Sequence, residues 1–164
     1  MKKLIVLLIM FLPLGVMAQE IKIAYVNVQE IFMAMPELSN IEKQLTEMNE
    51  KYTQELNVMR DEYQKKYSDY VAQQDSLTEN IKLRRMQEIE DIRSRMENFL
   101  PIAQQDMQKK QEELYKPVQE KIQNAIKSVG EEKGYTYIID PQVFLHIGNS
   151  AINATQFVRT KLGI

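Results

Sequence analysis

Three tyrosines are the side chains of this sequence whose type and spacing point most directly to a chemical role. Tyr63, Tyr67 and Tyr70 lie four and three residues apart, and this spacing places their phenol rings on one stripe of an α-helix. A phenol ring is apolar on its faces and polar at its hydroxyl, so it can pack on one side and meet water on the other. The stripe indicates either ordinary packing between helices or an adhesive surface for another polypeptide, and the sequence leaves both interpretations open.

Methionines extend this pattern along the same region of the chain. A methionine side chain is flexible and suits surfaces that accept varied partners, although in a helix seam it more often fills gaps. The candidate partner-binding residues are therefore the three tyrosines together with Tyr52, Met59, Met86, Met96 and Met107.

The residue types give little support for catalysis or metal binding. The chain has no cysteine, and its one histidine is His146, so disulfide frameworks and thiolate metal sites are excluded. It has no Gly-rich phosphate loop, no basic stripe and no paired carboxylates in a pocket-like setting. We expect a protein that is not an enzyme, uses no cofactor or metal and binds no nucleic acid.

The first eighteen residues have the layout of a secretory signal peptide. Two lysines precede an apolar run over residues 4–12, and a small residue, Ala18, precedes Gln19. The run is shorter than the ~20 residues that span a bilayer. We expect residues 1–18 to be cleaved off at the Ala18–Gln19 bond during export to the periplasm, leaving a mature chain that is not inserted in a membrane; an uncleaved anchor is the alternative.

The middle of the chain, residues 37–114, predicts a long helical arm. Apolar residues recur at nearly the 3.5-residue spacing of a coiled coil over 38–70 and follow an eleven-residue repeat over 92–125. Between these stripes, Ser76-Leu77-Thr78-Glu79 fits a capping box with Ser76 as the N-cap. This predicts two helices that fold back at 75–76 as an antiparallel hairpin, which opposes Tyr67 to Arg84 and allows a cation–π contact. A single helix of about 95 residues is the alternative.

Two prolines interrupt the second helical pattern. Each removes a backbone hydrogen bond and crowds the preceding turn. We expect bends at Pro101 and, at the root of the arm, at Pro117. The alternative at Pro101 is a break that ends the helix.

The two ends of the mature chain supply a small β-rich body, residues 19–36 and 115–164. The β-branched and aromatic run over 21–28 predicts a strand, and 135–140 with 143–147 predict a β-hairpin. Asn153 can cap a last helix over 154–162. Three short strands bury too little surface to be stable alone, so we expect the body to assemble copies of the chain.

In this order, the features resemble the Skp/OmpH family of periplasmic chaperones over essentially the whole mature chain. The matching stretches are IAYVNVQEIF, KPVQEKIQNAIKSVGEEKGYTYIID and SAINATQFVRTKLG. The resemblance implies a mainly α fold with a small β body that assembles a homotrimer, from which helical-hairpin arms project. It also implies that unfolded outer-membrane β-barrel proteins are held without ATP and passed on toward outer-membrane assembly. Carried over by position, the residues of the trimer body would be Ile23, Tyr25, Val26, Val129, Tyr137, Ile138 and Ile139.

A structural coiled-coil spacer or adaptor of the cell envelope, without clients, is the competing hypothesis. A spacer should have closed, leucine-rich seams and rigid arms, whereas a chaperone of this kind needs softer, incomplete seams. The tyrosines, the methionines, Gln111 and Pro101 favour the chaperone.

Overall fold

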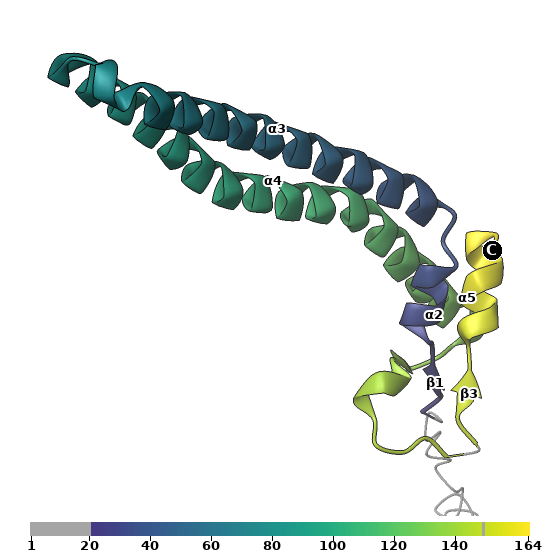
Figure 1. The fold of residues 1–164 in the computed structure, drawn as a ribbon. Helices are drawn as coiled ribbons and strands as arrows, with labels where there is room; N and C mark the ends of the chain where they lie inside the picture. Colours follow the sequence, from purple (N-terminus) through teal and green to yellow (C-terminus); the bar gives the residue numbers. More distant parts are fainter. Residues whose placement is uncertain (1–20, 149) are drawn as a thin grey trace, which may run out of the picture.

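The computed structural model describes residues 21–148 and 150–164, and it consists of a small base with a long pair of helices projecting from it (Figure 1). The expected signal peptide and its Ala18–Gln19 cleavage site lie outside these residues. Most of the described chain is helical, and the few strand residues are confined to the base.

Two helices form the projecting arm. Helix α3 spans Glu37–Gln73, a 3₁₀ turn (η1) spans Gln74–Ser76, and helix α4 spans Glu79–Lys133. The two helices lie side by side along their length (Figure 1). Helix α4 continues through Pro101 and Pro117, so the alternative of a helix break at Pro101 is wrong. It curves where it approaches the base (Figure 1), and it ends at Gly134, whose positive φ of 67° favours glycine.

The turn at the arm tip differs from the predicted capping box. The N-cap of α4 is Thr78, because Leu77 and Thr78 are both extended and the helix begins only at Glu79. The Ser76 hydroxyl instead donates a hydrogen bond to the carbonyl of Gln73 (2.8 Å), which closes the preceding turn. The longer turn shifts the pairing of the two helices.

The register of the arm differs accordingly from the expected one. A turn centred at 75–76 opposes Glu37 to Leu114, whereas the structure pairs Glu37 with Lys121 (2.5 Å). Nearer the tip, Lys66 pairs with Glu88 (2.8 Å), where Arg85 was the expected neighbour. The position of a turn therefore cannot be placed closely enough from sequence to give the partners across a helix pair.

The sheet has three short parallel strands in the order β2-β1-β3. Strand β1 (Ile23–Tyr25) lies between β2 (Tyr137–Ile139) and β3 (Ile152–Asn153). The strand expected over 21–28 is shorter because Val28 already begins helix α2 (Val28–Met33), whose first turn is capped by the Asn27 side chain.

The predicted β-hairpin of 135–140 with 143–147 is wrong. Residues Pro141–Val143 form a second 3₁₀ turn (η2), and residues 144–148 are not in a strand. The Asp140 carboxylate accepts a hydrogen bond from the backbone N–H of Gln142 (3.0 Å), which starts this turn and leads the chain away from β2. Strand β2 pairs with β1 instead, and β3 supplies the third strand.

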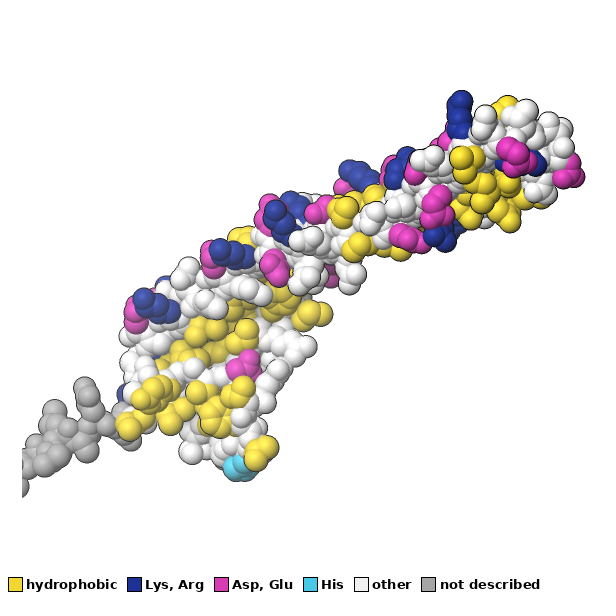
Figure 2. Space-filling model, turned by 90° about the vertical axis from the view of Figure 1, so that its left-hand side faces the viewer, with side chains coloured by type: hydrophobic (Ala, Val, Ile, Leu, Met, Phe, Trp, Pro, Cys, Tyr) yellow, Lys and Arg dark blue, Asp and Glu magenta, His cyan; other side chains and the backbone are white. Residues whose placement is uncertain are grey.

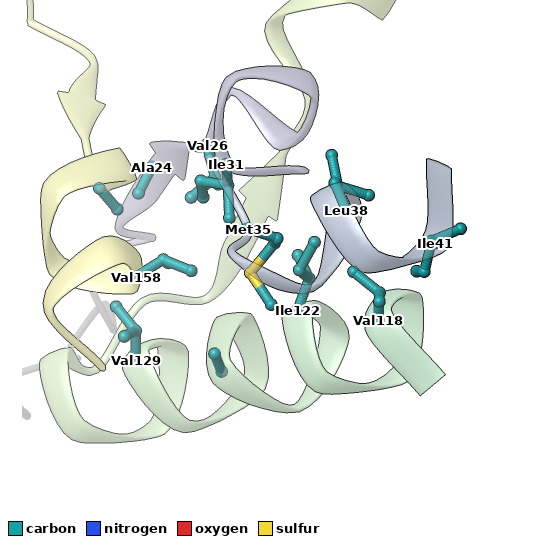
Figure 3. Packing of buried hydrophobic residues seen from close by; sticks show 12 residues of the cluster. Ala24, Val26, Ile31, Met35, Leu38, Ile41, Val118, Ile122, Val129 and Val158 are labelled. Carbon is teal, nitrogen blue, oxygen red and sulfur yellow. The ribbon is translucent and has the colours of Figure 1, made fainter. Parts of the chain in front are cut away.

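The main hydrophobic core lies in the base, where α2, the lower part of α4 and helix α5 (Thr155–Leu162) cover one face of the sheet (Figure 3). Helix α5 follows Asn153, whose side chain accepts a hydrogen bond from the N–H of Thr155 (3.0 Å). The buried residues of this core are Ala24, Val26, Ile31, Met35, Leu38, Ile41, Val118, Ile122, Ala125, Val129, Ala154 and Val158.

Candidate binding surfaces of the arm and the base

The tyrosine stripe lies on α3 toward the arm tip. The rings of Tyr63 and Tyr67 stack on each other, with centroids 6.0 Å apart and planes 6° from parallel, so the i, i+4 spacing joins two rings of one helix. The Tyr67 side chain is 50% exposed, while Tyr63 and Tyr70 are half-buried. The stripe thus packs and faces solvent at once.

The cation–π contact expected between Tyr67 and Arg84 is not formed. Arg84 pairs instead with Glu88, its neighbour one turn along α4 (3.2 Å). Over residues 21–148 and 150–164, the cation–π contact that the structure shows lies in the base, where Lys133 sits over the ring of Phe157.

Tyr52 joins the two arm helices at mid-height. Its ring meets Phe99 of α4 edge-on, with centroids 5.8 Å apart, and its hydroxyl donates a hydrogen bond to the Asp106 carboxylate (3.1 Å). Partial burial and then the Asp106 charge raise the pKa of the Tyr52 phenol. Beside it opens a hollow of about 380 Å³ that Leu100 and Met107 also line. Tyr52 is therefore a link in the seam at the edge of a small hollow.

The four candidate methionines are placed differently. Met86 is 48% exposed, whereas Met59, Met96 and Met107 are half-buried along the seam. Further apolar side chains of the arm are exposed and were not among the candidates. The sequence carried a signal for them, because apolar residues outside the predicted stripes are expected to face solvent. These further side chains are Val58, Val71, Ile81, Leu83 and Ile102.

Charged pairs tie the arm helices to each other at both ends. Near the tip, the Glu88 carboxylate accepts hydrogen bonds from Lys66 and then Arg84, which hold its pKa below the ordinary value. At the base, the hydrogen bond from Lys121 lowers the pKa of Glu37. The arm is otherwise close to neutral, with 15 basic and 17 acidic residues over 42–128, so it has no strong single-sign field for a charged partner.

The seven residues assigned to a trimer body do not share one surface. Val26 and Val129 are buried in the chain's own core, and the Ile138 side chain packs 3.3 Å from the Cβ position of Gly130 on α4. Because side chains alternate along a strand, the other four lie on the opposite face of the sheet. That face carries Ile23, Tyr25, Tyr137 and Ile139.

This second face of the sheet is apolar and uncovered in the single chain. Tyr137 is 60% exposed and Ile23 is 46% exposed. The segment after η2 adds Phe144 and the fully exposed Leu145. His146 lies in the same segment and is exposed. A soluble protein leaves an apolar surface of this kind open chiefly where it meets a partner.

The described residues contain no cluster of three or more histidine, cysteine, aspartate or glutamate side chains with the geometry of a metal site. None of the helices in the described part of the chain is long and apolar enough to cross a membrane. The fold defines a class of protein with a helical arm on a small base, and exposed apolar side chains lie on both parts.

The chain belongs to the OmpH-like family. The family model described as "Outer membrane protein (OmpH-like)" matches residues 22–162, which confirms the resemblance predicted from sequence. The chain is 31% identical over 132 residues to "Chaperone protein Skp" of Pectobacterium atrosepticum, covering 79% of this chain and 78% of that protein. It is 34% identical over 125 residues to the protein of the same name from Yersinia enterocolitica, covering 74% of each.

A solved structure shares the fold. The crystal structure of an OmpH-like protein from Caulobacter crescentus CB15 superposes with a TM-score of 0.75. The match covers 87% of this chain and 83% of that one, at 10% sequence identity. Such low identity shows a common architecture alone.

Proposed function

We propose that the protein is an ATP-independent periplasmic chaperone that holds unfolded outer-membrane β-barrel proteins, prevents their aggregation and delivers them toward outer-membrane assembly. The observation that carries the proposal is the arm: apolar and aromatic side chains stay exposed along it, in a chain of the OmpH-like family whose relatives are named Skp chaperones. The spacer hypothesis makes no use of these side chains.

The incomplete seam of the arm supports this proposal. Helix α3 has 37 residues, and its two buried residues, Leu38 and Ile41, both lie near the base. Farther out, α3 contributes half-buried tyrosine, methionine and leucine side chains to the seam, and the buried side chains there are Ile89, Ile92 and Ala103 of α4. Covering exposed apolar area with an unfolded segment is favourable by about 25 cal/mol per Å², and this interaction is tolerant of sequence. Such a surface can hold many different unfolded chains weakly.

We further propose that the functional unit is a homotrimer with an antiparallel hairpin arm on each protomer. The apolar second face of the sheet and the exposed segment around Phe144 would form the shared body. The core of a single base is small, and joining three copies would bury additional apolar surface where one chain leaves it open.

The decisive experiment measures holding activity and mass together. A urea-unfolded porin is diluted into buffer with and without excess mature protein, and turbidity is followed; light scattering gives the mass of the chaperone. We expect suppression of turbidity without nucleotide and a mass of three chains. Full aggregation of the porin would refute the holding function, and a monomeric mass would refute the trimer separately.

The surface through which the protomers assemble is tested by placing an aspartate on each face of the sheet in turn. Tyr137→Asp should dissociate the oligomer while leaving helicity intact, because the residue is exposed in the single chain. Ile138→Asp should unfold the base instead, since its side chain packs against α4. Leu83→Asp, at an equally exposed position of the arm, is the control and should keep the native mass. A native mass for Tyr137→Asp would place the interface elsewhere.

The spacer or adaptor remains a second candidate because specific contacts stiffen the arm. The Tyr52–Asp106 hydrogen bond and the Lys66–Glu88 ion pair both connect α3 to α4. A spacer would form the oligomer and fail the porin assay, so the same experiment separates the two functions.

A further inference from the structure

A groove at the root of the arm combines an apolar floor with an unusual rim. It lies between the short helix α2 and the lower part of α4 and encloses about 610 Å³. Its floor consists of Val28, Phe32, Ile122 and Ile126. Phe32 is held against Tyr115 of α4, with ring centroids 5.5 Å apart, so this side of the floor is fixed in place.

The rim of the groove is made of primary amides. Gln29 stands on the α2 side, and Gln119 and Gln123 stand on the α4 side. Gln119 also borders an adjoining hollow of about 490 Å³, where Gln108 and Gln111 continue the row. These positions recur every three or four residues, apart from the step across Tyr115, so they lie on one face of α4.

Charge is scarce in the groove. Charged residues make up 27% of the whole chain, yet among the residues lining the groove only Asp140 is charged. Figure 2 shows the same contrast on one face of the molecule: hydrophobic side chains gather over the base, while basic and acidic ones are spread along the arm. An acidic partner segment would lose hydration here without gaining an opposite charge, and a basic segment would find a single carboxylate, that of Asp140.

Glutamine amides match the groups that an unfolded chain exposes. A primary amide offers two N–H donors and a carbonyl acceptor at once, and an extended backbone presents unpaired N–H and C=O groups in alternation. Gln29 is already oriented, because its carbonyl accepts a hydrogen bond from the Gln142 side chain (2.7 Å). The rim can therefore bond to a main chain of any sequence while the floor takes its apolar side chains.

We propose that this groove, whose floor is Val28, Phe32, Ile122 and Ile126, binds an extended, uncharged segment of unfolded polypeptide through main-chain hydrogen bonds to its glutamine rim. The inference rests on the proposed holding function and deepens it, since it adds a defined subsite at the root of the arm to the diffuse apolar surfaces farther out.

The test replaces rim amides by isosteric carboxylates. The double variant Gln119→Glu, Gln123→Glu removes amide donors from the groove and adds two negative charges to it. The control is the double variant Gln87→Glu, Gln105→Glu, which adds two negative charges at exposed positions of α4 outside the groove. Retention of a urea-unfolded porin is measured by the dissociation constant, together with helicity and oligomer mass. We expect the groove variant to bind about tenfold more weakly, as for the loss of one or two hydrogen bonds, and the control to bind like the wild type.

The outcomes separate this inference from the function on which it rests. If the wild type does not hold the porin, the proposed function itself fails. If the wild type holds it and both variants bind equally well, the groove is not a client site. If the groove variant alone falls apart into single chains, the groove is covered by a second copy of the protein and the inference is overturned. A photo-crosslinker at position 119 should label the porin, and the Gln119→Glu, Gln123→Glu background should not change the labelling from a crosslinker placed on the arm at position 105.

Discussion

The base and the arm are stabilised in different ways. The base closes a core of twelve buried residues contributed by strand β1, by four helices and by the segments that connect them (Figure 3). Along the arm beyond this core, the buried residues among those described are Ile89, Ile92 and Ala103, all on α4. The remainder of the arm seam is half-buried and is supplemented by pairs such as Lys66–Glu88.

This difference follows from geometry. Two helices alone can cover only one side of each other, so most side chains between them keep part of their surface in water, and full burial is confined to a few positions such as Ile92. In the base, further layers cover the remaining sides. Most of the stabilising burial is therefore concentrated at one end of the molecule, and the surface suited to partners is spread along the other.

The largest expected effect compares buried isoleucines of the two regions. Ile31→Ala in the base should lower the free energy of unfolding by about 2–5 kcal/mol, because it leaves a cavity in a core closed on all sides. Ile92→Ala in the arm should fall at the lower end of this range, about 2 kcal/mol, since the two helices can approach and fill part of the space. Urea denaturation followed by circular dichroism measures both. Equal losses would show that the arm is packed as tightly as the base.

A proline in the arm should lower its stability. Pro101→Ala restores a helical N–H inside α4 and should raise the free energy of unfolding by about 1–3 kcal/mol. Gln105→Ala, one turn further along, changes helix propensity alone and should alter stability by less than about 0.5 kcal/mol. The same denaturation experiment applies. No gain at position 101 would mean that the local curvature of α4 depends on packing rather than on the proline.

The tyrosine stripe tests whether the arm surface is for packing or for binding. Changing Tyr63, Tyr67 and Tyr70 together to serine removes one stacked pair, worth about 1 kcal/mol of stability, and in addition the apolar area that the rings bury in the seam. Client retention should fall by a larger factor than helicity does, because Tyr67 is half exposed. Porin binding and circular dichroism are measured on the same sample. Proportionate loss of both would support packing as the only role of the rings.

The smallest expected effect concerns acid. The folded-state pKa of Glu88 lies below its ordinary value of 4.5 because Lys66 and Arg84 donate to the carboxylate. Its stabilising contribution is therefore present above that pH and is lost as the pH falls through the lowered pKa. Between pH 5 and pH 3 the melting temperature should fall slightly less in Glu88→Gln than in the wild type. Glu90→Gln is the control, because Glu90 pairs with Arg93 of the same helix at an exposed site. If the melting temperature falls equally with pH in all three proteins, the Lys66–Glu88 ion pair does not contribute to the acid sensitivity.

Much of the architecture was predictable from sequence because helical periodicity is a local signal. The apolar stripes and the absence of glycine over residues 37–129 predicted two long helices, and the structure has them at Glu37–Gln73 and Glu79–Lys133. The short β-rich segments at both ends predicted a small sheet in the base. The candidate arm surface was predicted in part: Tyr67 and Met86 are exposed, whereas Tyr52 and Met107 lie in the seam.

The predictions from sequence failed where the same local pattern fits more than one tertiary arrangement. Residues 143–147 have the composition of a strand, yet the turn at Asp140 and the pairing of β2 with β1 leave them outside the sheet. The seven residues predicted to form the trimer body were assigned by their position in the sequence. In the structure, the alternation of side chains along the strands divides them between the core of the single chain and an open face of the sheet. The glutamine rim at the root of the arm was not found, because its members are ordinary polar residues until α2 and α4 place them around one apolar floor.

The sequence by itself determined the long helices, the position of the arm between two halves of a base, and the family, since these depend on residue spacing and on the order of local motifs. Only the tertiary structure decided the register of α3 on α4, the parallel order of the three strands and which apolar side chains stay exposed. The physical reason is that burial and strand pairing depend on which distant segments meet. A shift of one residue at a turn or in a strand changes those partners while leaving the local pattern the same.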